Sequence, residues 1–401
     1  MNLLNKDERF TVNAIFYIYF LIGIYALAVG TMVPLMREEY GFSYEMSGFL
    51  LSVNSAGSLV MSLVASYTAI FFGLRKAYAI QHTFVIVGLI ILVVAEHPAF
   101  LMTGIALIGM ARGSAANYSM QIVNDITKSN SRVIGLLTVF YAAGACLIPV
   151  FVLFCITALG SWKYACIVIA AASAAGILMT LKMKIETVGG NSNAEKRGDY
   201  SFFKRIKFCL PLILLFFYMG FEVSVVGWIV TYYTEVHHVS DRLASSMASM
   251  LWVTMLVGRI ICSILAGRVK KSEMIMYLSI GLVISSVFFV FSTSTGLLIA
   301  ATIGIGMFMS GYYSIVVADA GHVFSEYRLA FGYFVMLSGL GSVIMPSLIG
   351  VVAERQGVQA GIKILAAVAV ILIVLAFWNV RTDKKNEKAL SETCDIPGPA
   401  N

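Results

Sequence analysis

The chain has 401 residues, of which 59% are hydrophobic and 12% are charged, and its mean hydropathy is +0.88. A soluble protein of this length has too little interior to bury so much apolar surface, so the composition excludes a soluble globular domain. The formal net charge of +7 does not indicate a nucleic-acid partner, because the basic residues gather in segments between apolar stretches.

Twelve apolar stretches follow one another along the chain, each long enough to cross a bilayer. A membrane helix needs about 20 apolar residues to cross a hydrocarbon core about 30 Å thick. The predicted spans are 12–36, 46–71, 77–95, 100–126, 132–159, 162–181, 208–234, 242–266, 274–292, 295–319, 328–353 and 360–380. The sequence therefore predicts an all-α, multi-pass membrane protein with twelve transmembrane helices.

The Lys and Arg residues between these spans fall mainly on alternate sides. With the N-terminus inside, the inner segments hold the basic runs at 182–207, 268–271 and 381–388. The outer loops hold only Arg37, Lys163, Arg242, Arg355 and Lys363. This positive-inside bias predicts a protein of the cell membrane with both termini in the cytoplasm.

The longest polar interruption divides the spans six and six. Residues 182–207 are rich in Gly, Asn, Ser and charged residues, which is typical of a flexible linker. We expect an N-terminal six-helix bundle at 1–181, a cytoplasmic linker at 182–207, a C-terminal six-helix bundle at 208–380 and a cytoplasmic tail at 381–401.

The two halves share sequence features at equivalent positions. The fifth span has Gly144 five residues before Pro149, and the eleventh has Gly341 five residues before Pro346. The fourth and tenth spans share the tripeptide Ile-Gly-Met. Repeated six-helix halves are typical of a transporter that rocks around a central site.

Three segments resemble the major facilitator superfamily and, within it, the fucose:proton symporter family. They are Gly113-Ser114-Ala115-Ala116-Asn117, the pair Gly258-Arg259 with the basic loop 267–271, and Ser338-Gly339-Leu340-Gly341. The resemblance implies two six-helix bundles with pseudo-twofold symmetry and a cavity lined by the first, fourth, seventh and tenth spans. Gly113 replaces an acidic residue of the family, and the first span has no carboxylate, so the resemblance alone does not establish proton coupling.

Away from the ends of the predicted spans, three charged residues remain: Arg112, Glu222 and Arg259. A charge at the centre of a membrane helix costs about 2.5–3.5 kcal/mol, so each needs a partner or a task. Glu222 shares a helical stripe with Tyr218 in the seventh span. We hypothesise that Glu222 takes up a proton, accepts hydrogen bonds from substrate hydroxyls, or does both. The alternative is a structural carboxylate paired with Arg or with hydroxyl groups.

The fourth span has a polar face formed by Gly113, Asn117, Gln121 and Asp125. The amides either line a cavity for a hydroxylated substrate or join packed helices. Arg112 lies about 140° from Asn117 around an ideal helix, so both cannot point into one cavity. Arg112 in the cavity would favour an anionic substrate such as a sugar acid, whereas Arg112 among neighbouring helices would be a structural ion-pair partner.

Charges near helix ends predict a cytoplasmic gate whose ion pairs join the bundles in one state and break in the other. The alternative is ordinary helix-end charges. The predicted gate residues are Asp125, Arg132, Arg259, Asp319, Glu326 and Arg328. Trp252 and Tyr312 are further candidates for the substrate site, because aromatic rings stack on sugar faces, with packing as the alternative.

The sequence predicts a secondary active transporter that moves a small polar solute, such as a monosaccharide, by alternating access in symport with H+. The alternatives are transport of a sugar acid, proton-coupled efflux of amphipathic compounds, and a nutrient receptor on a transporter fold. No catalytic grouping, phosphate loop or metal-ligand spacing appears, so we expect no enzymatic activity, metal or cofactor. We expect a monomer in the lipid bilayer.

Overall fold

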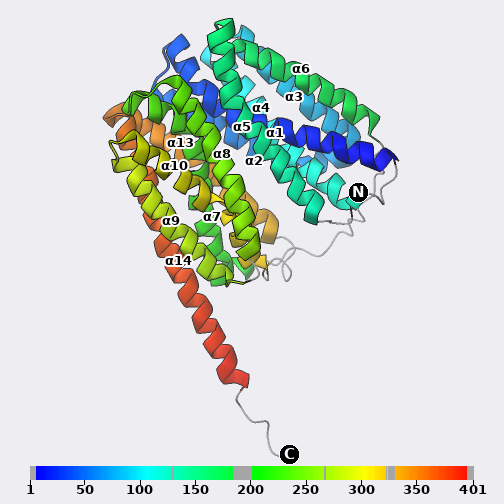
Figure 1. The fold of residues 1–401 in the computed structure, drawn as a ribbon. Helices are drawn as coiled ribbons and strands as arrows, with labels where there is room; N and C mark the ends of the chain where they lie inside the picture. Colours follow the sequence, from blue (N-terminus) through cyan, green and yellow to red (C-terminus); the bar gives the residue numbers. More distant parts are fainter. Residues whose placement is uncertain are drawn as a thin grey trace, which may run out of the picture.

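A computed structural model shows the chain as an assembly of membrane-length helices (Figure 1). The structure describes residues 6–127, 131–183, 201–265, 268–321, 323 and 330–394. Within these ranges, twelve helical segments are long and apolar enough to span a membrane, and no strand occurs. The predicted all-α membrane fold is confirmed.

The first six spans are α1 (Lys6–Tyr40), α2 (Tyr44–Phe72), α3 (Leu74–Val94), α4 (Pro98–Thr127), α5 (Ser131–Leu159) and α6 (Lys163–Lys182). A 3-10 turn, η1 (Ser201–Lys204), precedes the second six. These are α7 (Ile206–Thr231) with its π-helical end η2 (Tyr232–Val236), α8 (Asp241–Leu265), α9 (Lys271–Phe291), α10 (Thr295–Met309) with α11 (Tyr312–Asp319), α13 (Ala330–Gln356) and α14 (Val358–Cys394). The twelfth span, α14, continues as helix through residues that we assigned to the tail, as far as Cys394.

Short turns join several consecutive spans, and local chemistry explains the turn between α1 and α2. Gly41 separates α1 from α2 with a φ of 66°, a conformation that glycine adopts without strain. Ser43 then caps α2, because its hydroxyl accepts a hydrogen bond from the Met46 N–H at 3.0 Å. The turn brings the start of α2 beside the end of α1, where both face the second half of the chain.

The same helix pairings occur in both halves. The first span packs on the fifth, the second on the fourth, and the third on the fourth and sixth. The second half repeats these pairs as α7 on α13, α8 on α10, and α9 on α10 and α14. The two halves are therefore structural repeats, as the pseudo-twofold prediction requires.

The glycines shared by the two halves lie at equivalent helix crossings. A Cβ atom on Gly144 would lie 2.0 Å from the Phe20 carbonyl oxygen of α1. One on Gly341 would lie 1.9 Å from the Phe216 carbonyl oxygen of α7. Only glycine allows the backbones to approach so closely, so each glycine fixes the contact of one helix pair.

The two bundles come together at one end and diverge at the other (Figure 1). They meet through α2 on α13, α5 on α8 and α1 on α7. We call the diverging end the linker side, because α6 ends there at Lys182 and η1 begins there at Ser201. The opposite end, with the turn between Tyr40 and Tyr44, is the closed side.

Candidate substrate and proton site

The three charged residues inside the spans gather between the two bundles. Glu222 of α7 interacts electrostatically with Arg259 of α8 and with Arg112 of α4. Each of the three side chains is half-buried. In the described part of the chain, neither arginine has a nitrogen within 4.0 Å of a Glu222 oxygen. The charges are therefore close enough to influence one another but do not form a direct ion pair.

Two tyrosines complete this group, and we call all five residues the central cluster: Arg112, Tyr141, Glu222, Arg259 and Tyr313. Tyr141 of α5 interacts with all three charged residues, and Tyr313 of α11 interacts with Glu222. Tyr313 is 38% exposed. The residues of the central cluster come from α4 and α5 of one bundle and from α7, α8 and α11 of the other. Its internal contacts therefore depend on the relative position of the two bundles.

The tenth span is interrupted beside the central cluster. Helix α10 ends at Met309, and α11 begins at Tyr312 after Gly311, which has a φ of 75°. The buried Tyr218 lies within hydrogen-bonding reach of Glu222, but its hydroxyl donates to the Met309 carbonyl at 2.7 Å. Tyr218 therefore satisfies a carbonyl that the interruption leaves without a helical partner, and it links that interruption to Glu222.

The interruption also decides which tyrosine of α11 reaches the cluster. Tyr312 is fully buried, stacks on Tyr218 with ring centroids 4.6 Å apart, and shares a hydrogen bond with the Ser279 hydroxyl at 3.0 Å. These contacts lie inside the C-terminal bundle. They match the alternative in which Tyr312 packs against neighbouring helices and does not stack on a substrate. Its neighbour Tyr313 faces Glu222 instead.

The described part of the predicted polar face of α4, Gly113 and Asn117, lies against α2. A Cβ atom on Gly113 would lie 2.0 Å from the Ser58 carbonyl oxygen, which leaves no room for an acidic side chain at this position. One turn later, the Asn117 amide donates to the carbonyl and hydroxyl oxygens of Ser62, both at 2.9 Å. Asn117 therefore joins two helices of one bundle, and Arg112 is the residue of α4 that interacts with Glu222.

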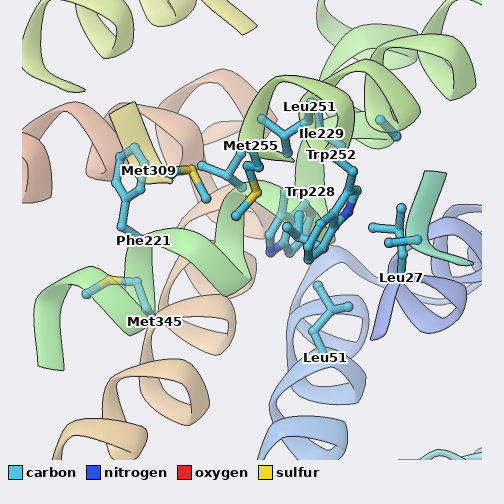
Figure 2. Close-up of a cluster of buried hydrophobic side chains, with 14 of the residues drawn as sticks. Leu27, Leu51, Phe221, Trp228, Ile229, Leu251, Trp252, Met255, Met309 and Met345 are labelled. Atoms are coloured by element: carbon cyan, nitrogen blue, oxygen red, sulfur yellow. The ribbon is translucent and has the colours of Figure 1, made fainter. Parts of the chain in front are cut away.

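Figure 2 shows buried apolar side chains from both bundles, which we call the apolar layer; along α7 and α8 they lie between the central cluster and the closed side. Its residues are Leu27 of α1, Leu51 of α2, Trp228 and Ile229 of α7, and Leu251 and Trp252 of α8. The Trp252 ring meets the Tyr141 ring edge-on across the bundle interface, with centroids 5.4 Å apart. The buried indole N–H groups of Trp228 and Trp252 have no hydrogen-bond partner in the described structure. The layer therefore holds two unused donors, of which Trp252 lies beside Tyr141 of the cluster.

Beyond the apolar layer, polar contacts join the bundles at the closed side. Arg37 of α1 forms an ion pair with Glu235 of η2 and lies 4.4 Å from the ring centroid of Tyr44. The Tyr44 hydroxyl donates to Glu235, and the Tyr44 backbone N–H donates to Glu354 of α13 at 2.7 Å. We call Arg37, Tyr44, Glu235 and Glu354 the latch. Sequence analysis missed the latch, although Arg37 is one of the few basic residues assigned to the outer loops.

The predicted cytoplasmic gate is only partly visible. Arg259 interacts with Glu222 in the central cluster, and its role in the gate stays a prediction. Asp319 accepts a hydrogen bond at 2.8 Å from Asn379 of α14, within its own bundle. Glu326 and Arg328 lie outside the described residues, as do the side chains of Gln121, Asp125 and Arg132. The gate formed by the remaining residues stays a prediction.

Two repeated bundles that meet around a half-buried charged cluster define the class of protein as a membrane transporter. The chain matches the family model described as Major Facilitator Superfamily over residues 15–325 and 273–400, and it belongs to that superfamily. It is therefore a multi-pass membrane transporter and not an enzyme. The closer resemblance to the fucose:proton symporter family stays a prediction.

Several relatives cover nearly the whole chain. A protein named TsgA homolog from Buchnera aphidicola subsp. Baizongia pistaciae is 19% identical, and the match covers 93% of this chain and 97% of the relative. The glucose/mannose transporter GlcP of Bacillus subtilis is 20% identical, with 93% and 95% covered. A mutant form of the nucleoside transporter NupG has a similar structure, with a TM-score of 0.76, 14% identity, and 92% and 99% covered. At this identity, the structural likeness shows the fold alone.

Proposed function

We propose that this protein is a secondary active transporter that carries a small polar, hydroxylated solute past the central cluster, with H+ bound at Glu222 as the coupling ion. One observation carries the proposal: Arg112, Glu222 and Arg259 meet between the bundles, are half-buried, and form no direct ion pair. Charges persist at this depth where they face protein partners or water on a transport path. A relative named for glucose and mannose supports a hydroxylated solute.

The arrangement of contacts supports alternating access. The latch and the apolar layer close one side, while the bundles diverge on the linker side (Figure 1). The distribution of Lys and Arg favours a cytoplasmic linker side in the cell membrane. On this assignment, the structure is an inward-facing state, and opening requires the latch to break as the linker side closes.

Glu222 suits a coupling role because its charge acts across the bundle interface. Ionised Glu222 attracts Arg112 of the other bundle as well as Arg259 of its own bundle. A proton on Glu222 removes both attractions and frees the arginines for the solute. Proton and solute together then change the relative stability of the two access states, which is what coupling requires.

Transport by purified protein in proteoliposomes tests this proposal. D-glucose, uridine and D-gluconate serve as radiolabelled probes, with and without an inward-directed proton gradient. We expect the wild type to accumulate at least one probe when the gradient is present. Glu222→Gln should still exchange that probe in counterflow but should no longer accumulate it.

The control is Glu96→Gln, which removes an exposed carboxylate between α3 and α4 and should behave like the wild type. Accumulation by Glu222→Gln at the wild-type level would exclude Glu222 as the coupling residue. A folded wild type that transports none of the probes would refute the proposed solute class.

A further inference from the structure

The central cluster holds more positive than negative charge. Arg112 and Arg259 each contribute a guanidinium group, and among the described side chains Glu222 is the one carboxylate that interacts with them. An arginine remains protonated at any physiological pH. An uncompensated positive charge at this depth is costly, and a bound anion would offset that cost.

The two guanidinium groups are also unused as donors. In the described structure, neither Arg112 nor Arg259 donates a hydrogen bond to a protein acceptor or pairs with a carboxylate within 4.0 Å. Each guanidinium carries five N–H donors in a planar fork that matches a carboxylate. The unpaired indole N–H of Trp252, which is 3% exposed, lies beside Tyr141 of the same cluster. The Trp252 donor is buried without an acceptor in the described chain, and the two half-buried guanidinium groups are free to bind one.

We infer that the transported solute is a hydroxylated monocarboxylate, held between Arg112 of one bundle and Arg259 of the other, and that it crosses together with one proton on Glu222. This inference rests on the proposed function and names its substrate class. The carboxylate would contact both bundles at once, because α4 and α8 belong to different halves. The solute's hydroxyl groups would accept hydrogen bonds from donors such as the Trp252 indole.

Charge balance gives the stoichiometry. The empty cluster with ionised Glu222 carries one net positive charge. A monoanion that binds with a proton on Glu222 leaves this net charge unchanged, whereas an anion beside ionised Glu222 is repelled by it. One proton and one monoanion together carry no net charge across the membrane, so transport should be electroneutral.

The proton has one acidic acceptor among the groups that face this site. The charged and titratable side chains that interact with Glu222 are Arg112, Tyr141, Tyr218, Arg259 and Tyr313. Helices α13 and α14 also pack on α7, but within the described residues they place no such side chain in range of Glu222. Tyr19 of α1 reaches the cluster only through Tyr141. Glu222 is therefore the carboxylate that takes the proton.

Isothermal titration of the purified protein with D-gluconate, D-glucuronate and D-glucose tests the anion site. We expect at least one of the acids to bind tenfold or more tightly than D-glucose. Arg112→Gln and Arg259→Gln should each weaken binding of that acid by at least tenfold. Arg112→Lys and Arg259→Lys should recover part of the affinity, because they keep the charge but lose the fork.

Uptake under potassium and valinomycin tests the stoichiometry. The initial rate for the bound acid should be equal with the membrane potential at zero or negative inside, provided that the pH gradient is fixed. Failure of both acids to bind, equal binding of D-glucose, or unchanged affinity in the arginine variants would overturn the inference. Accumulation of D-glucose that responds to the potential would also overturn it while leaving the proposed function intact. Binding of an acid without accumulation of any probe would instead refute the proposed function.

Discussion

The latch sets how readily the closed side opens, and Glu235→Gln should shift that equilibrium. Glu235 accepts a hydrogen bond from Tyr44 and forms an ion pair with Arg37. The side chain of Glu235 is 22% exposed, and that of Arg37 is 25% exposed. A partly exposed ion pair contributes about 0.5–1 kcal/mol after solvent screening, and the bond from Tyr44 to a charged acceptor adds about 1 kcal/mol. The loss of about 1.5–2 kcal/mol corresponds to a change of about 10- to 30-fold in the population of the open state.

A matched control separates opening from general destabilisation. Glu39 also pairs with one cation, Lys163, at 2.8 Å and accepts one neutral hydrogen bond, from the Trp162 indole at 2.7 Å. Its side chain and that of Lys163 are 38% and 26% exposed, so the chemistry and the environment are similar. The contacts of Glu39 join α1 to α6 within one bundle. Glu39→Gln should therefore leave the access equilibrium unchanged.

The rate at which an impermeant maleimide labels a single cysteine measures the open population. Ser347 of α13 is suitable, because it lies at the contact with α2, where its hydroxyl bonds that of Ser52 at 2.8 Å. The Ser347→Cys reporter is placed in a background without the six native cysteines. We expect labelling from the closed side to rise about 10- to 30-fold in Glu235→Gln, following the population change above, and to stay constant in Glu39→Gln. Equal labelling in both variants would refute the reasoning.

Other predictions address packing and the bundle interface. Gly113→Ala places a Cβ atom 2.0 Å from the backbone of α2. It should destabilise the protein by about 1–3 kcal/mol, measured by thermal unfolding. The control Gly321→Ala, where a Cβ atom would have nothing within 4 Å, should leave the stability unchanged. Tyr218→Phe leaves the last carbonyl of α10 without its donor and should cost about 1–3 kcal/mol in the same assay; an unchanged melting temperature would contradict this role. Ser52→Cys combined with Ser347→Cys should form a disulfide on oxidation that stops uptake until reductant is added, and undiminished uptake in the cross-linked protein would argue against alternating access.

The spans and the repeat could be predicted from sequence because both depend on local pattern. Each span is a long apolar run, and the pair Gly144 and Gly341 marks the same helix crossing in each half. Side-chain direction was harder to predict, since most faces of these helices are apolar and periodicity does not fix their rotation. For α4, Gly113 was the residue that could have predicted the rotation of the helix. A glycine in close contact with α2 orients the face that carries Asn117 toward α2 and away from Glu222.

Two other features of the site could not be predicted from local pattern, for physical reasons. The tenth span reads as one continuous helix in the sequence, but the interruption at Gly311 decides that Tyr313, and not Tyr312, faces the cluster. Arg259 lies closer to the linker-side end of its span, so its position suggested a gate, whereas its long side chain interacts with Glu222. Contacts between bundles such as Arg37 with Glu235 join residues far apart in the chain, and no local pattern predicts them.

Proton movement into vesicles provides the most direct test of the central cluster. Proteoliposomes loaded with a pH-sensitive dye are given the probe that the wild type transports, with no initial pH gradient. We predict that the lumen acidifies as the solute enters, and that Glu222→Gln exchanges the same solute without acidification. Equal acidification by Glu222→Gln and the wild type would contradict the account.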